Sequence, residues 1–262
     1  MRRSGTALLA PLPAFGLAAL ALSGCDRMAP ARDDRPAEAR DFPIADRPVA
    51  PIISTRWATE EARDRLHEAE QVMNWAGVKP GMTVADLGAG EGYYTVRLAK
   101  RVGPHGRVLA EDIVGEVIDA LGRRVTRENW SNVSVKLGTP ENPKLPAASF
   151  DRVFMVHMYH EIAEPYAFLW YLYPSLKPTG EVIVLESDRP TDHHGTPPEL
   201  LRCEFAAIGF VQVAMQRRPT SGAYLARFVM GAGKPADPSQ IVPCRLRRPD
   251  AAKAPPASRR DE

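Results

Sequence analysis

Residues 84–92 read VADLGAGEG, and this stretch decides the fold. A short apolar strand ends at Leu87, glycines follow at alternate positions, and a helical segment begins near Tyr93. Glycine permits a positive φ and lets a ligand approach the main chain, both of which a Cβ hinders. A helix that begins directly after such a turn presents free N–H groups. The stretch therefore predicts a strand–turn–helix unit with a polar ligand at the turn.

The glycine spacing separates two classes of nucleotide cofactor. A dinucleotide fingerprint, G-x-G-x-x-G, needs glycine at position 93, where this chain has Tyr93. The pattern is instead an acid followed by glycines at every second position, which resembles motif I of the class I S-adenosylmethionine (SAM)-dependent methyltransferases. The resemblance implies that SAM is the cofactor and that it contacts Asp86, Gly88, Ala89, Gly90 and Gly92.

Around this unit, apolar strands alternate with amphipathic helices, the first of which is expected over residues 59–76. Such alternation predicts an α/β fold with a doubly wound, mostly parallel sheet. The last two strands are too close together for a crossover and predict a C-terminal antiparallel hairpin. This arrangement resembles the seven-stranded class I methyltransferase fold, which carries such a hairpin at its sheet edge. The expected strands are residues 82–87, 108–110, 133–137, 150–157, 181–185, 210–215 and 224–230.

Acidic residues beyond the glycine turn are candidates for holding the nucleoside. Asp112 follows the second strand, where an acid accepts hydrogen bonds from both ribose hydroxyls. Glu111 is adjacent and points to the opposite face, so Asp112 is favoured, with a helix N-cap as its alternative role. Many members of the family place an acid after the glycine of the third strand to hold the adenine. This chain has Thr139 there, and Glu141 is the expected substitute.

The segment after the fourth strand supplies the catalytic candidates. Tyr159, His160 and Glu161 form a Tyr-His-Glu sequence that resembles a group of secreted bacterial methyltransferases, as does the later sequence at 188–192, DRPTD. His160 is the expected general base, with a structural histidine as the alternative. Tyr159 and His157 are further catalytic candidates, and His157 is also expected to contact SAM. No metal is expected, because the spacing lacks an H-E-x-x-H pair, although five residues form a candidate metal set: His157, His160, Glu161, His193 and His194.

The N-terminal residues predict export. A basic start precedes an apolar stretch from Ala7 to Leu22, and the sequence LSGC at 22–25 resembles a bacterial lipobox. Residues 1–24 are therefore expected to be a lipoprotein signal peptide, with Cys25 lipidated and anchored on the periplasmic side of the envelope. Asp26 favours the inner membrane by resemblance to enteric lipoproteins. The alternative is a cytoplasmic protein whose translation starts at Met28.

The composition of the rest of the chain predicts one folded domain between two disordered segments. Residues 25–55 are expected to be a disordered tether, 56–232 the methyltransferase domain, and 233–262 a disordered tail rich in proline and basic residues. The net charge is only +2 and no basic, aromatic-interleaved surface is visible, so a nucleic-acid partner is not expected. Cys203 and Cys244 either pair or stay free. A buried free thiol is favoured, because Cys203 falls within an apolar helical pattern.

Methyl transfer from SAM is therefore the predicted activity, with a small molecule or a protein as acceptor. No Asn-Pro-Pro-Tyr segment follows the fourth strand, which argues against methylation of the amino groups of DNA bases. Two alternatives remain. The first is a non-catalytic envelope lipoprotein that binds SAM or S-adenosylhomocysteine as a sensor or scaffold, and the second is an NAD-dependent oxidoreductase, which Tyr93 disfavours.

Overall fold

A computed structural model of the 262-residue chain describes residues 33–52, 59–218 and 221–245. The predicted signal peptide, Cys25, Asp26 and Met28 lie outside these residues. Within the described ranges, none of the helices has the length and apolar character needed to cross a bilayer.

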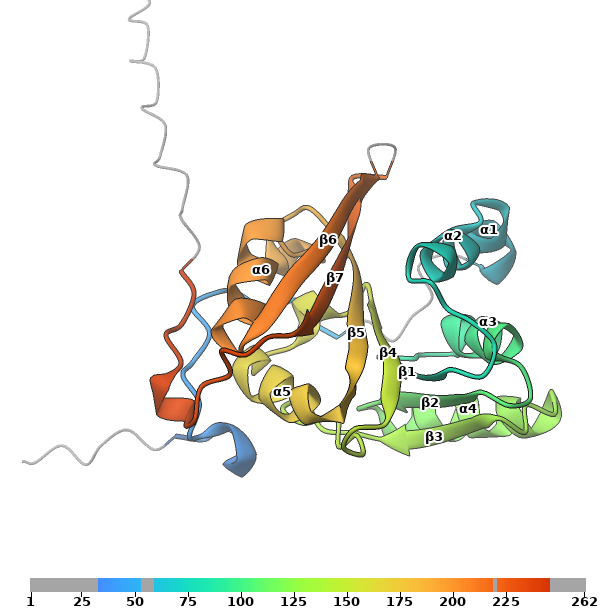
Figure 1. Ribbon diagram of the computed structural model, residues 1–262, viewed down its shortest axis with the longest axis horizontal. Coiled ribbons are helices and arrows are strands. Elements are labelled where there is room, and N and C mark those ends of the chain that lie inside the picture. The colour runs from blue at the N-terminus through green and yellow to red at the C-terminus, as the bar shows by residue number, and fades with distance from the viewer. Residues whose placement is uncertain (1–32, 53–58, 219–220, 246–262) are drawn as a thin grey trace, which may run out of the picture. The chain divides into compact units, whose positions relative to one another are not determined.

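Seven strands form one sheet in the order β3-β2-β1-β4-β5-β7-β6 (Figure 1). Strands β1 to β5 pair in parallel, whereas β7 lies antiparallel to both β5 and β6. The predicted fold, including the terminal hairpin, is thus confirmed. The strands are β1 Thr83–Leu87, β2 Arg107–Asp112, β3 Val133–Leu137, β4 Phe150–Val156, β5 Leu176–Ser187, β6 Phe210–Arg218 and β7 Ala223–Met230.

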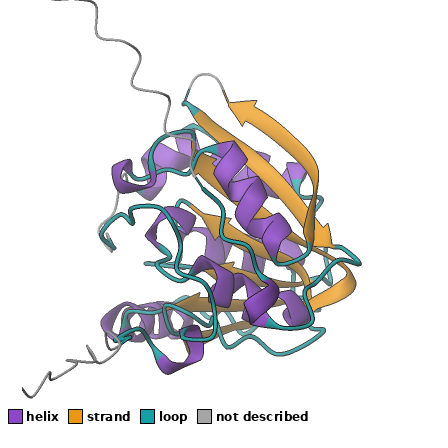
Figure 2. Cartoon of the chain, turned by 90° about the vertical axis from the view of Figure 1, so that its left-hand side faces the viewer, coloured by secondary structure: helices purple, strands orange, loops and turns teal. Residues whose placement is uncertain are grey.

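Helices cover both faces of the sheet, as Figures 1 and 2 show. Alternation along β4 explains how: Val153 and Met155 pack in the core that includes α5 and α6, whereas Phe154 packs in the core that includes α2 and α3. Because the strands are apolar on both faces, burial on both sides follows. The helices are α1 Glu60–Arg65, α2 Glu68–Trp75, α3 Tyr93–Val102, α4 Gly115–Arg127, α5 Pro165–Leu172 and α6 Pro198–Ala207.

The single helix expected over residues 59–76 is wrong, because the chain breaks at His67. His67 has a left-handed backbone, with φ 51°, and separates α1 from α2. The break lets α1 turn its acids toward the helices that follow the glycine turn. Glu60 and Asp64 form ion pairs there with Arg97. Thr59 caps α1, its hydroxyl accepting a hydrogen bond from the Ala62 amide at 3.2 Å.

The domain extends further toward the N-terminus than the sequence predicts. Residues 35–52, expected to be part of a disordered tether, pack on the domain instead. Phe42 is buried, and its ring makes edge-to-face contacts with the rings of Trp170 and Tyr171. Arg47 is buried in an ion pair with Glu204 of α6, at 2.9 Å. The segment contributes a few isolated anchors with no helical or strand period, which explains why composition alone suggests disorder.

The folded domain also extends beyond its predicted C-terminal end at residue 232, because a disulfide attaches the segment 233–245 to α6. Cys244 forms a disulfide with Cys203, with a Cα–Cα distance of 6.0 Å. Ile241 is buried in the core, and the Cys244 amide donates to the Tyr166 hydroxyl at 2.7 Å. The favoured free thiol at Cys203 is therefore wrong. Its helix does present an apolar face, but the partner cysteine arrives from a segment that carries no pattern of its own.

Candidate SAM site

The carboxyl ends of β1, β2, β4 and β5 meet at one edge of the sheet, and the glycine turn lies at that edge. Gly90 and Gly92 both have positive φ, 55° and 87°. A Cβ on Gly92 would collide with Leu121 of α4, so that glycine serves packing. A Cβ on Gly90 would meet no atom within 4 Å. The turn therefore borders open space at Gly90, as a main-chain cradle for a ligand requires.

Asp112 lies directly beside this open space. One of its carboxylate oxygens accepts from the Gly90 amide at 3.0 Å, and the other accepts from the Val114 amide at 3.1 Å. The second bond is the capping contact that the sequence allows as an alternative, although the helix cap itself is Val114. A half-buried carboxylate at the end of β2, next to the glycine turn, suits a ribose diol, whose two hydroxyls are donors.

Asp112→Ala is expected to weaken SAM binding about 30-fold, because hydrogen bonds to a charged group contribute roughly 1.5–3 kcal/mol. Isothermal titration with SAM and S-adenosylhomocysteine measures the change. Asp119→Ala, on the exposed face of α4, is the matched control and should bind as the wild type does. Unchanged affinity in Asp112→Ala would remove the ribose assignment.

Glu111 points away from Asp112, as expected, into a closed environment. Its side chain lies against Gly138, where any Cβ would overlap the carboxylate. Burial, reinforced by the charge of Asp112, raises the pKa of Glu111 to about 8, although the Gly88 amide donates to the carboxylate. One of its carboxylate oxygens, Oε1, is buried without a hydrogen-bond partner. Glu111 is therefore neutral at neutral pH and can donate a hydrogen bond as well as accept one.

Glu111→Gln is expected to stabilise the ligand-free protein, and by more as the pH rises. Native Glu111 stays protonated up to about pH 8, whereas an ordinary glutamate ionises near pH ~4.3. Between these values unfolding releases a proton, so the stability of the wild type falls with rising pH, and glutamine removes that loss. Between pH 5 and pH 7 the difference in unfolding free energy should widen by roughly 2 kcal/mol. Denaturant unfolding measures it, and a difference that does not depend on pH would contradict a neutral Glu111.

Asp86, expected to contact SAM, holds the local structure together. It is buried and accepts from the Thr95 hydroxyl at 2.6 Å. Burial raises the pKa of Asp86 to about 6 despite this bond. The pair fastens the first turn of α3 to β1 and so positions the glycine turn between them. Contact with the cofactor stays a prediction for Asp86.

The predicted adenine contact lies in the loop after β3. Thr139 and Asn142 close this loop through two reciprocal main-chain hydrogen bonds. Glu141, between them, is buried, and its Oε2 has no hydrogen-bond partner. A buried carboxylate oxygen without a donor is costly, and an adenine amino group would supply the donor. The geometry is compatible with the predicted role of Glu141.

His157, at the end of β4, faces α2 rather than other catalytic candidates. Its Nε2 lies 3.8 Å from a Glu68 carboxylate oxygen. Burial would raise the pKa of Glu68, but the hydrogen bond and charge of His157, together with Arg63, lower it to about 2. Sequence reasoning missed Glu68 and Arg63, because an ion pair between α2 and a strand end leaves no local pattern.

Tyr159 and His160 occupy different environments. The Tyr159 side chain is wholly buried and donates to Glu204 at 2.7 Å, which favours a structural role over the predicted catalytic one. His160 is also buried, and its Nδ1 contacts both carboxylate oxygens of Glu186 at 3.0 and 3.1 Å. Its Nε2 has no hydrogen-bond partner, so this atom alone remains available for chemistry.

Comparisons with known proteins agree with this arrangement. Residues 84–180 match the family described as a methyltransferase domain. The chain is 34% identical over 85 residues to nocamycin O-methyltransferase of Saccharothrix syringae, covering 32% of this chain and 30% of the relative. It is 33% identical over 117 residues to the ubiquinone/menaquinone biosynthesis C-methyltransferase UbiE of Hydrogenovibrio crunogenus, covering 44% and 46%. Each match thus spans less than half of the relative's length.

The fold is shared with a solved SAM-dependent methyltransferase from Aquifex aeolicus. The TM-score is 0.58 at 23% identity, covering 65% of this chain and 98% of that one. The [4+2]-cyclase SpnF also shares the fold, with a TM-score of 0.56 at 15% identity, covering 74% of this chain and 89% of that one. Residues 84–180 therefore match a methyltransferase domain, and the chain shares the fold of a SAM-dependent methyltransferase.

Proposed function

We propose that the whole protein is an active methyltransferase that transfers the sulfonium methyl of SAM to a small molecule or a protein in the bacterial cell envelope. The observation that carries this proposal is the open space at Gly90, bordered by the Asp112 carboxylate. Transfer of a sulfonium methyl is an in-line displacement from a good leaving group. The protein therefore needs chiefly to align donor and acceptor and to exclude water.

The envelope location rests on two independent features. The first is the predicted lipobox, which would anchor the chain through Cys25 on the periplasmic side, at the inner membrane as Asp26 favours. The second is the Cys203–Cys244 disulfide, since such bonds persist in oxidising compartments and are rare in the cytosol. This location requires that SAM reach the envelope. Cys25→Ser should release the protein from membrane fractions, and an unchanged distribution would favour the cytoplasmic alternative that starts at Met28.

Labelled methyl transfer from SAM into periplasmic and membrane extracts tests the activity. Incorporation that falls in Asp112→Ala at limiting SAM and persists in Asp119→Ala supports it.

Binding of SAM or S-adenosylhomocysteine without a methylated product would favour the second candidate, a non-catalytic envelope lipoprotein. One observation supports that candidate: the [4+2]-cyclase SpnF shares the fold, so the fold alone does not specify methyl transfer.

A further inference from the structure

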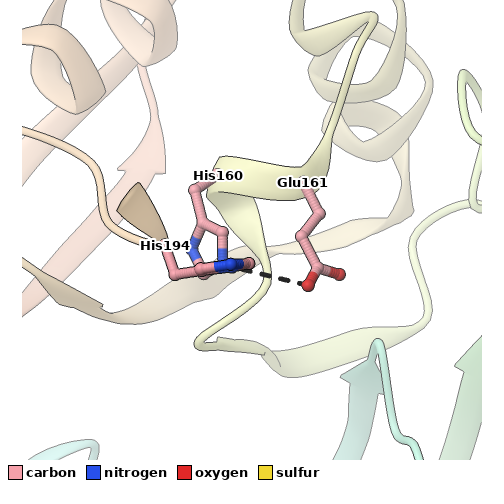
Figure 3. A group of neighbouring side chains, drawn as sticks. All are labelled: His160, Glu161 and His194. Carbon is pink, nitrogen blue, oxygen red and sulfur yellow. Dashed lines mark ion pairs between the residues drawn. The ribbon is translucent and has the colours of Figure 1, made fainter. Parts of the chain in front are cut away.

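Three side chains of metal-binding type converge beyond the carboxyl ends of β4 and β5. His160 and Glu161 belong to a 3-10 turn, η2 (Tyr159–Glu161), and His194 follows a second turn, η4 (Thr191–His193). One ligand atom from each lies within 4.8 Å of the other two. Figure 3 shows the three side chains gathered at one place, with the ion pair of His160 and Glu161 marked; its atoms are 3.9 Å apart.

Glu186 fixes the orientation of the His160 ring. Its carboxylate is wholly buried and contacts Nδ1 through both oxygens, which holds the proton on Nδ1 and turns Nε2 toward the cluster. Metal-binding histidines usually have such a carboxylate behind the ring, because it sets the tautomer and raises the basicity of the metal-binding nitrogen.

The Nε2 atom of His160 is an unsatisfied polar atom in a buried position. The side chain is only 1% exposed, and Nε2 has no hydrogen-bond partner. A buried ring nitrogen without a partner costs free energy that a bound ligand would recover. Two groups that could share a ligand with it lie close by. They are the imidazole of His194, whose ring meets that of His160 edge to face at 5.4 Å, and the carboxylate of Glu161.

We propose that His160, Glu161 and His194 bind a divalent metal ion of the zinc class. Two imidazole nitrogens and one carboxylate oxygen suit zinc, cobalt or nickel better than magnesium or calcium, which prefer oxygen ligands alone. Three protein ligands would leave a position open for an external group, as in catalytic zinc sites. His160 is then a metal ligand rather than the general base, because its Nε2 cannot bind a metal ion and accept a proton at the same time.

The segment that carries His160 comes close in space to the predicted cofactor site. Met158, two residues before His160, approaches Gly88 so closely that a Cβ there would lie 3.1 Å from the methionine side chain. A metal ion at the cluster would hold an oxygen or nitrogen atom of the methyl acceptor at its open position. This role rests on the proposed function, whereas metal binding itself does not.

Titration of the purified full chain with Co²⁺ and Zn²⁺ tests the proposal. The protein is prepared without a histidine tag, treated with a chelator, and kept free of reductant so that Cys203 and Cys244 stay paired. We expect one equivalent of Co²⁺ with the visible absorption of a low-coordinate nitrogen and oxygen site, displaced by Zn²⁺. No SAM is added, so failure here is distinguishable from failure of the methyltransferase assignment.

Variants identify the ligands. His194→Ala and Glu161→Gln should each weaken Zn²⁺ binding by about 100-fold or more, and Glu186→Gln, behind the ring, by about 10-fold. His193→Ala is the matched control, because His193 is the exposed neighbour of His194 and should leave affinity unchanged. Thermal unfolding without metal establishes that each variant folds. Absence of stoichiometric binding, or an equal loss in His193→Ala and His194→Ala, would overturn the proposal.

Discussion

Gly90→Ala is expected to weaken SAM binding by about 100-fold or more while leaving the domain folded. The methyl group added at Gly90 meets no protein atom within 4 Å, so it enters the space that the ligand needs. A left-handed φ of 55° makes alanine unfavourable by roughly 1–2 kcal/mol, which the domain should tolerate. Isothermal titration with SAM, combined with thermal unfolding, separates the two effects.

Gly81 offers a matched control for this variant. It has a positive φ of 86°, its Cβ would also meet nothing within 4 Å, and it lies before β1, at the opposite end of the strand. Gly81→Ala should therefore lose a similar amount of stability and no affinity. Gly92→Ala should instead lose stability above all, because its Cβ collides with Leu121. Equal SAM affinity in Gly81→Ala and Gly90→Ala would show that the ligand does not lie against the turn.

Arg47→Met is expected to lower the free energy of unfolding by roughly 3–5 kcal/mol, the range for removing one partner of a buried ion pair. The two side chains are 0% and 1% exposed. Besides its bond to Glu204, Arg47 donates to the Ile162 carbonyl at 3.0 Å. Its loss leaves the Glu204 carboxylate buried with the Tyr159 hydroxyl as its remaining partner. Burial already raises the pKa of Glu204, so the uncompensated charge is costly.

Denaturant unfolding of three variants isolates this pair. Arg40→Met removes an exposed arginine from the same segment and should change stability little. Arg47→Met combined with Glu204→Gln should recover part of the loss, because no charge then remains buried. A single Arg47→Met variant as stable as the wild type would mean that residues 35–52 do not contribute to the folded domain.

The parts of the fold that the sequence predicts are those with a strong period or a fixed backbone requirement. The strands around Val153 and the glycine turn at Gly90 combine local geometry with burial, so they can be recognised from a short window. The break at His67 could not, because a left-handed residue inside an apolar helical pattern is selected by ion pairs with distant helices. Tertiary contacts override the local preference there.

The site divides in the same way. Asp112 follows from its position after the second strand, and its two hydrogen bonds agree with the predicted place beside the turn. The neutral Glu111, by contrast, depends on Gly138, which lies on another strand end and leaves no room for a side chain. His160 is predicted as a general base or a structural histidine, but its pairing with Glu186 depends on a strand 26 residues away along the chain. Such pairs require the fold before they can be seen.

If Cys25 is acylated as proposed, the packed segment that begins at Arg35 limits how far the folded domain can lie from the lipid surface. Only about ten residues separate Cys25 from Arg35, and a fully stretched chain covers at most about 3.5 Å per residue, or roughly 35 Å. A flexible linker that ran from Cys25 to residue 55 would have about three times that maximum length. With Cys25 acylated, the domain would lie close to the lipid surface. Molecules that are embedded in that surface or bound to it would then be the methyl acceptors nearest to the proposed site.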